Sequence, residues 1–220
     1  MQPDLVIFDC DGVLVDSEPI ANRIFVAHLA RHGIAMTVEA ALRDLVGRSL
    51  PSCVALLEER HGRRLPEDFA TVLQAATMQA FENELQPVAG IAEALDQISC
   101  ATCVASSSAP AKIRLSLGLT GLLPRFDGRL YSASEVPRGK PYPDLFLHAA
   151  ARMGHPPARS VVVEDAVPGV QAAAAAGMRV LAYAGAAHAD TVRLSDAGSE
   201  ISTAMADAKL NIVDMINRDL

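Results

Sequence analysis

The sequence predicts an α/β fold, with a Rossmann-like parallel sheet core flanked by helices and an inserted all-helical cap domain. Short, mainly apolar runs at 5–8, 160–163 and 179–183 have the length and composition of strands, and the first two are typical of strands that are buried on both faces. Helical patterns separate the apolar runs after residue 90, and such alternation is typical of βαβ units. No convincing strand pattern occurs between 17 and 84, which predicts a helical insertion after the first strand.

The limits of this insertion follow from the residues at its two ends. Ser17-Glu18-Pro19 is a typical helix start, because a capping hydroxyl is followed by an early proline. Pro87-Val88-Ala89-Gly90 contains turn-forming residues and precedes the next core helix. We therefore assign residues 1–16 and 87–220 to the α/β core and residues 17–86 to the helical cap.

The other core elements can be placed in order after this turn. We expect helices over 91–98, from Pro110, over 145–153 and from Pro168 to a capping Gly177, and strands over 101–105, 130–132 and 200–202. A rigid turn with two prolines, Lys140 to Asp144, precedes the third helix. Strands and helices alternate through most of this region, which predicts that the strands run parallel.

Composition limits the partners and the location that we expect. The chain has 19 Lys and Arg residues against 26 Asp and Glu residues, a net charge of −7. This charge argues against a nucleic-acid partner or an acidic membrane surface. No apolar run approaches the ~20 residues of a membrane span, and Met1-Gln2-Pro3-Asp4 lacks the pattern of a signal peptide. We therefore expect a cytoplasmic protein. We also expect a monomer or a weak dimer.

The four cysteines leave one alternative to weigh. Cys100 and Cys103 form a C-x-x-C pair, which in other proteins can be redox-active or bind zinc. A strand is predicted over 101–105, and residues three apart in a strand face opposite ways. No second Cys or His pair completes a zinc site, so we favour cysteines without a redox or zinc role.

A pair of carboxylates follows the first predicted strand. Asp9 and Asp11 would share one face of an extended backbone while Cys10 points away, and Gly12 would allow a sharp turn. Ligands of open α/β sheets bind at this end of the strands. Two neighbouring carboxylates repel each other unless a cation lies between them, and Mg²⁺ prefers such oxygen ligands. An acidic turn without a ligand is the alternative for this motif alone.

Two other predicted strands also end in polar residues. Ser106 follows the strand over 101–105, and Glu164-Asp165 follows the strand over 160–163. Lys140, one of only three lysines, lies in the turn with two prolines. Each residue has a structural alternative, because serines cap helices, acids favour helix starts and lysines are often solvated. Their joint occurrence at the ends of successive strands favours a site.

These groups together suit phosphoryl transfer, in which catalysis depends on positioning and charge neutralisation. Asp9 can attack phosphorus, and Asp11 can protonate the leaving oxygen and then deprotonate water. Mg²⁺ can bridge carboxylates and a phosphate oxygen while other groups hold the remaining oxygens. The candidate phosphate-binding residues are Ser106, Lys140, Gly12 and Ser107.

Four motifs, in this order, resemble those of the haloacid dehalogenase superfamily, in the branch of phosphatases and β-phosphoglucomutases. They are DCDGVLVDS from Asp9 to Ser17, Val104-Ala105-Ser106, RGKPYPD from Arg138 to Asp144, and Val163-Glu164-Asp165. The resemblance spans nearly the whole chain, including the helical cap between the first and second motifs. It implies an enzyme with a Rossmann-like core, and a phosphatase is the activity that we favour.

The resemblance also implies roles for individual residues. Asp9 would be the nucleophile and Asp11 the acid/base, while Ser106 and Lys140 would bind phosphate. The implied Mg²⁺ ligands are Asp9, the carbonyl group of Asp11, Glu164 and Asp165. We therefore predict a Mg²⁺-dependent phosphatase of small phosphorylated metabolites, with sugar or sugar-acid phosphates favoured, that acts through an aspartyl-phosphate intermediate.

Caps supply substrate selectivity in this family. The loop Gly47-Arg48-Ser49 is expected to face the site, where Arg48 could clamp a second anionic group of the substrate. A plain surface arginine is the alternative. The candidate selectivity residues of the cap are Arg48, Ser49 and Glu18.

Three rival functions are weighed against the phosphatase. A phosphoglucomutase of this branch would carry a cap histidine ten residues after the acid/base, where this chain has Ala21. A haloacid dehalogenase would lack an acid at the position of Asp11. A non-enzymatic phospho-receiver domain would take its acid pair and phosphoacceptor from different strands and would have no cap.

Overall fold

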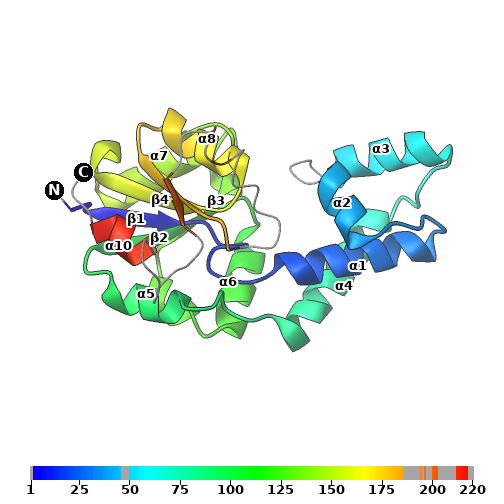
Figure 1. Ribbon diagram of the computed structural model, residues 1–220, viewed down its shortest axis with the longest axis horizontal. Helices are drawn as coiled ribbons and strands as arrows, with labels where there is room; N and C mark the ends of the chain where they lie inside the picture. The colour runs from blue at the N-terminus through cyan, green and yellow to red at the C-terminus, as the bar shows by residue number, and fades with distance from the viewer. Residues whose placement is uncertain are drawn as a thin grey trace. The chain divides into compact units, whose positions relative to one another are not determined.

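The computed structural model describes residues 2–45, 50–185, 194, 196, 200–202 and 212–217. The chain divides into two compact units, which Figure 1 shows as a sheet with its helices and as a group of helices. Unit 1 comprises Met1–Asp16 and Gln86–Leu220, and unit 2 is the continuous segment Ser17–Leu85. Each unit has a hydrophobic core of its own.

Unit 1 contains a six-stranded parallel sheet with the strand order β3-β2-β1-β4-β5-β6. The strands are β1 (Leu5–Phe8), β2 (Ala101–Ser106), β3 (Leu130–Ser132), β4 (Ser160–Glu164), β5 (Arg179–Tyr183) and β6 (Glu200–Ser202). The predicted α/β fold with a parallel sheet is confirmed. The strands lie within one residue of the bounds expected from the sequence, and the helices for which both bounds were expected lie within two residues of them.

β1 lies at the centre of the sheet. Its four residues are fully buried, which explains why the run is continuously apolar. Ile7 lies opposite Cys103 on one side and opposite Val162 on the other. The chain builds outward from β1 to β3 in one direction and then from β4 to β6 in the other. A crevice for ligands is expected at this switch point, at the carboxyl ends of β1 and β4.

Helices cover both faces of the sheet. Figure 1 shows α7 (Asp144–Met153) and α8 (Val167–Ala175) on one face, and α5 (Ile91–Gln97) and α10 (Ile212–Asn217) on the other. α6 (Pro110–Leu119) connects β2 to β3, with a short 3₁₀ helix at Leu123–Phe126; two further 3₁₀ helices are Ala133–Glu135 and Pro157–Arg159. Alternate residues of β1 share a buried cluster with apolar residues of α7 and α8.

The two segments of unit 1 are tied together where unit 2 interrupts them. The Asp16 amide donates to the Gln86 carbonyl group at 3.0 Å, and the Val88 amide donates to the Leu14 carbonyl group at the same distance. Val15 and Pro87 form an antiparallel bridge between these two contacts. The chain therefore leaves and re-enters unit 1 at adjacent positions.

The regular secondary structure described in unit 2 is entirely helical. Its helices are α1 (Glu18–Arg31), α2 (Val38–Leu45), α3 (Leu50–His61) and α4 (Phe69–Glu84). Leu29, Ile34 and Leu57 are fully buried in its core. An ion pair at 2.6 Å joins Arg23 of α1 to Glu84 at the end of α4.

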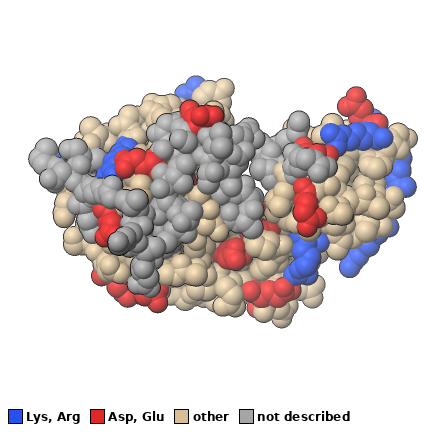
Figure 2. Space-filling model, viewed as in Figure 1, with Lys and Arg blue, Asp and Glu red and all other residues tan. Residues whose placement is uncertain are grey.

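The surface charge is mixed. On the face drawn in Figure 2, acidic side chains are spread over both units, and more of the visible basic side chains lie over unit 2. No helix among the described residues has the length and apolar character needed to cross a membrane.

Candidate active site

The carboxyl ends of β1 and β4 bring three carboxylates together. Asp9 directly follows β1, and its amide donates to the Val163 carbonyl group at 2.9 Å, which continues the pairing of the two strands. Glu164 ends β4, and Asp165 follows it. One oxygen from each of Asp9, Glu164 and Asp165 lies within 4.8 Å of the other two, and all three residues are buried. We call these three residues the carboxylate cluster.

Lys140 places an ammonium group in the carboxylate cluster. Its Nζ atom donates to Asp9 Oδ1 at 2.7 Å and to Glu164 Oε1 at 2.5 Å. Only 7% of the Lys140 side chain is exposed, and the Nζ atom lies 5.1 Å from the centre of the Phe146 ring. Three carboxylates and one ammonium group therefore lie close together, which leaves an excess of negative charge in a buried place.

Burial and the neighbouring charges change the proton affinities of Asp9 and Lys140. Burial raises the pKa of Asp9 to about 8; the Lys140 ammonium opposes this shift, and the Glu164 and Asp165 carboxylates reinforce it. Burial also opposes the charged form of Lys140, but Asp9 and Glu164 outweigh burial and raise the pKa of the lysine. A divalent cation would offset the excess charge, and the buried carboxylate oxygens form a donor set that suits Mg²⁺.

The orientation of Glu164 depends on the start of α8. Its Oε2 atom accepts hydrogen bonds from the Asp165 and Ala166 amides, both at 2.8 Å. A Cβ atom placed on Gly169 would lie 1.8 Å from Oε1 of Glu164, so only a glycine leaves room for this carboxylate. The sequence predicts only a helix start here, at Pro168; the contact of Gly169 with Glu164 depends on how α8 packs beside β4.

Asp11 lies outside the carboxylate cluster. Its Oδ2 atom accepts hydrogen bonds from Ser108 Oγ at 2.7 Å and from Lys112 Nζ at 2.8 Å. Asp11 was expected to reach a metal through its carbonyl group, and the direction of its carboxylate is compatible with that expectation. The sequence analysis missed Ser108 and Lys112 as partners of Asp11. Their spacing of four residues is a signal, but it does not by itself indicate which acid they bind.

The turn after Asp11 requires a glycine. Gly12 has a φ of +81°, in the left-handed region where side chains are disfavoured. Its amide donates to the Val15 carbonyl group at 2.8 Å, so this donor is engaged within the turn. The phosphate contact expected of Gly12 stays a prediction.

The predicted serines lie at the end of β2, next to β1 in the sheet. Ser106 is buried, and its Oγ atom accepts a hydrogen bond from the Ser108 amide at 3.1 Å. Ser107 is exposed. The structure thus brings Ser106 to the same edge of the sheet as Asp9 and Asp11, as the parallel strand order requires. The phosphate contacts of both serines stay predictions.

The turn that carries Lys140 is held by an ion pair of its own. Arg138 donates two hydrogen bonds from Nη2 to the Asp144 carboxylate, at 2.9 and 3.1 Å, and lies 4.5 Å from the centre of the Tyr142 ring. Asp144 is the first residue of α7. The ion pair between Arg138 and Asp144 therefore links the two ends of the turn that contains Lys140.

The three selectivity candidates belong to unit 2. Arg48 and Ser49 lie outside the described residues. Glu18 opens α1, where its carboxylate accepts a hydrogen bond from Asn22 Nδ2 at 3.4 Å. The selectivity role of all three residues stays a prediction.

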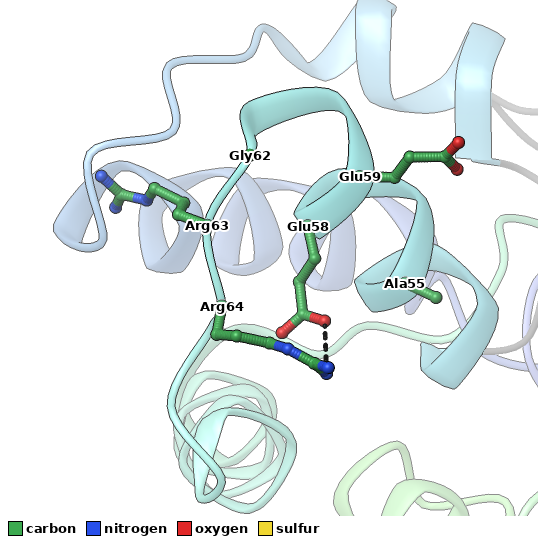
Figure 3. Close-up of a pocket in the computed structure, with 6 residues that line it drawn as sticks. All are labelled: Ala55, Glu58, Glu59, Gly62, Arg63 and Arg64. Atoms are coloured by element: carbon green, nitrogen blue, oxygen red, sulfur yellow. Dashed lines mark hydrogen bonds and ion pairs between the residues drawn. The ribbon is translucent and has the colours of Figure 1, made fainter.

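A shallow pocket of about 400 Å³ lies on unit 2, and it contains none of the predicted site residues. Figure 3 shows that the end of α3 and the loop after it line the pocket, with Glu58 paired to Arg64 across it. Arg63 comes from the same loop (Figure 3). With its acidic and basic side chains already partly paired, the pocket does not resemble the carboxylate cluster.

The family model for haloacid dehalogenase-like hydrolases matches residues 3–177. The chain therefore belongs to the haloacid dehalogenase-like hydrolases.

Among known relatives, the 6-phosphogluconate phosphatase of Escherichia coli (strain K12) is 32% identical over 186 residues, which cover 84% of each chain. Hexitol phosphatase B of the same strain is 28% identical over 220 residues, which cover 97% of this chain and 95% of the relative. A crystal structure of a family hydrolase from Deinococcus radiodurans R1, with bound phosphate and sodium, matches with a TM-score of 0.79. It is 32% identical, and the match covers 92% of each chain.

Proposed function

We propose that the protein is a Mg²⁺-dependent phosphatase that hydrolyses sugar or sugar-acid phosphates through an aspartyl-phosphate intermediate. The observation that carries this proposal is the position of Asp9, at the switch point of the sheet, between Lys140 and two further carboxylates. The phosphatase names of the two Escherichia coli relatives support the same activity.

In the first step, an Asp9 carboxylate oxygen attacks phosphorus, and the bond between phosphorus and the sugar oxygen breaks. Asp11 gives its proton to the departing oxygen, so that the sugar leaves as a neutral alcohol. Lys140 stabilises the charge on the transferring group from its place beside Asp9. Ser106, at the end of the neighbouring strand, is proposed to hold another phosphate oxygen.

In the second step, water attacks the phosphorus atom of the aspartyl phosphate. Asp11, now a carboxylate, takes a proton from this water, and the bond between Asp9 and phosphorus breaks. Inorganic phosphate leaves, the Asp9 carboxylate is restored and Asp11 is protonated again, which completes the cycle. Both roles of Asp11 require that its carboxylate face the reacting phosphorus from outside the carboxylate cluster.

The carboxylate cluster is proposed to hold Mg²⁺ through Asp9, Asp165, Glu164 and the Asp11 carbonyl group. When bound, the ion supplies positive charge that lets a dianionic phosphate approach the Asp9 carboxylate. The excess negative charge of the cluster supports this assignment, because without a cation it would repel the substrate.

Unit 2 is proposed to act as a cap that selects the leaving group. Arg48 is the residue proposed to bind a second anionic group, such as the carboxylate of a sugar acid. Ser49 and Glu18 are proposed to contact the polar hydroxyl groups of the substrate.

A panel of phosphorylated metabolites tests the proposal. The purified protein should release inorganic phosphate from 6-phosphogluconate or from a hexitol phosphate in the presence of Mg²⁺, and EDTA should stop the release. An Asp9→Asn preparation serves as the control for contaminating phosphatases. Turnover that is unaffected by EDTA would contradict the metal assignment, and no phosphate release from any member of the panel would contradict the function.

The same preparation separates hydrolysis from mutase activity. β-Glucose 1-phosphate with glucose 1,6-bisphosphate as a primer should yield inorganic phosphate or no product. Ala21 has no polar group with which to restrain Asp11 until a sugar phosphate arrives. Rapid formation of glucose 6-phosphate without release of phosphate would instead support a phosphoglucomutase.

A further inference from the structure

We propose that Lys112 is a positioning residue for Asp11. Together with Ser108, it fixes the direction of the Asp11 carboxylate for the transfer of a proton to the leaving oxygen. The inference rests on the proposed phosphatase reaction, and it adds two residues that neither the four family motifs nor the metal assignment require.

The contacts around Asp11 form a closed triangle. Ser108 Oγ and Lys112 Nζ both donate to the Oδ2 atom of Asp11, at 2.7 and 2.8 Å, and Lys112 Nζ also lies 3.1 Å from Ser108 Oγ. Two donors on a single oxygen restrict rotation of a carboxylate much more than one donor does. Hydrogen bonds to charged groups are also stronger than those between neutral groups.

Ser108 and Lys112 are both attached to regular secondary structure. The Ser108 amide donates to Ser106 Oγ at 3.1 Å, and the Ser108 carbonyl group accepts from Ser132 Oγ at 2.8 Å. These contacts link Ser108 to the ends of β2 and β3. Lys112 lies in the first turn of α6. Ile113, which follows it in the same helix, is buried. The lysine therefore reaches Asp11 from a fixed base.

The two lysines thus contact different carboxylates of the site. Lys140 binds Asp9 and Glu164 in the carboxylate cluster, whereas Lys112 binds Asp11. The Asp11 side chain is short and lies two residues from Asp9, so an anchor is needed to keep its carboxylate apart from the cluster. Proton transfer to a leaving oxygen depends strongly on such geometry, since small displacements of a catalytic group reduce rates about 100-fold.

A matched pair of substrates tests the positioning role. Phenyl phosphate has a poor leaving group that needs a proton, whereas p-nitrophenyl phosphate has a similar shape and a good leaving group. Lys112→Met should lower kcat/KM for phenyl phosphate about 10- to 100-fold and change it less than about threefold for p-nitrophenyl phosphate. Arg114→Met is the control, because it removes a positive charge from an exposed position on the same helix and should leave both values unchanged.

Further variants check whether the effect of Lys112→Met passes through Asp11. Ser108→Ala should also lower kcat/KM for phenyl phosphate relative to p-nitrophenyl phosphate. This variant tests the same contact if Lys112→Met folds poorly. In an Asp11→Asn background, Lys112→Met should cause no further loss on phenyl phosphate, because its effect passes through Asp11. Lys112→Arg should restore part of the phenyl phosphate activity.

Equal losses on the two substrates, or no loss on either, would overturn the positioning role. So would a full further loss in the Asp11→Asn background, which would mean that Lys112 binds the substrate itself. If the wild-type enzyme released phosphate from neither aryl ester nor from any sugar phosphate, the proposed function would fail, and the positioning role would fail with it.

Discussion

Asp9 and Asp11 are two residues apart in the sequence but lie in different electrostatic surroundings. Asp9 is buried among carboxylates and one lysine, while Asp11 binds a separate lysine and a serine at the edge of the site. When two acids have such different surroundings, they can take different chemical roles. The structure thus provides a physical basis for the proposed division into a nucleophile and an acid/base.

Asp9→Asn should lower the turnover rate at least about 1,000-fold, because an amide does not attack phosphorus. This loss corresponds to a rise of about 4 kcal/mol in the activation barrier. Phosphate release from p-nitrophenyl phosphate measures the loss. A variant that kept a tenth of the wild-type rate would contradict the assignment of the nucleophile.

The same variant should change how stability depends on pH. Burial raises the pKa of Asp9 to about 8, above the value of about 3.9 in an unfolded chain. The folded protein therefore binds this proton more tightly, and in EDTA the wild type should lose stability as the pH rises from about 4 to about 8. The side-chain amide of the Asp9→Asn variant cannot titrate, so the melting temperature of the variant should fall less over that range. Identical melting profiles for the two proteins would contradict the shift.

The thiols provide another test at the scale of single residues. Burial raises the pKa of Cys103 to about 12, and Cys10 and Cys53 are also buried, whereas Cys100 is partly exposed. A thiol reagent such as DTNB at pH 8 should therefore modify one cysteine of the folded protein quickly and all four after denaturation. Loss of the fast reaction in Cys100→Ser would identify the residue, and fast reaction at Cys103 would revive a redox role for the pair.

At the scale of the elements, the strands could be predicted from the sequence. The contacts between residues at the ends of the strands could be predicted only in part. β1 and the three valines of β4 form apolar runs because both faces of the sheet are covered, so these runs are visible in the sequence. The positions of Ser106 and Lys140 follow from parallel strands and a stiff turn. Lys112 and Gly169 could not be predicted, because their roles depend on how α6 and α8 lie against neighbouring strands, which local sequence does not encode.

The packing of α8 makes Gly169 a sharp test. In Gly169→Ala the new methyl group would collide with the Glu164 carboxylate, so the carboxylate must move away from Lys140. We expect a loss of about 1–3 kcal/mol in stability and a weaker affinity for Mg²⁺. Calorimetry in EDTA followed by a Mg²⁺ titration measures both effects.

Gly118→Ala is the matched control for this substitution. Gly118 is the next-to-last residue of α6, and a Cβ atom there would meet nothing within 4 Å. The control should gain about 0.5–1 kcal/mol in stability, because alanine favours a helix more than glycine does, and its Mg²⁺ affinity should not change. If the two variants behaved alike, the contact with Glu164 would not explain the effect of Gly169→Ala.

At the scale of the whole molecule, every described candidate for catalysis, phosphate binding or metal binding lies in unit 1, on both sides of the insertion point in the sequence. The selectivity candidates lie in unit 2, which has its own buried core. Binding of Mg²⁺ should therefore stabilise one unit and not the other.

Hydrogen exchange can locate this effect. At a Mg²⁺ concentration one hundred times its Kd, the added stability is about 2.7 kcal/mol. Hydrogen exchange of the amides of β1 and β4 that exchange by opening of unit 1 should slow by the matching factor. Amides in the core of unit 2, such as that of Leu57, should exchange at the same rate with and without the ion. Equal slowing in both units would show that they unfold as one.

The two crossings between the units, at Asp16 and Gln86, are joined by a hydrogen bond within unit 1. An insert whose ends lie side by side can be exchanged as a module, since a new segment needs only to begin and end at one place on the host. During evolution, replacement of the insert would then change the preferred leaving group of the substrate and leave the residues that carry out the reaction unchanged. Chimeras that carry the 17–85 segment of a relative should accordingly take on the substrate range of the donor and keep the Mg²⁺ dependence of the host.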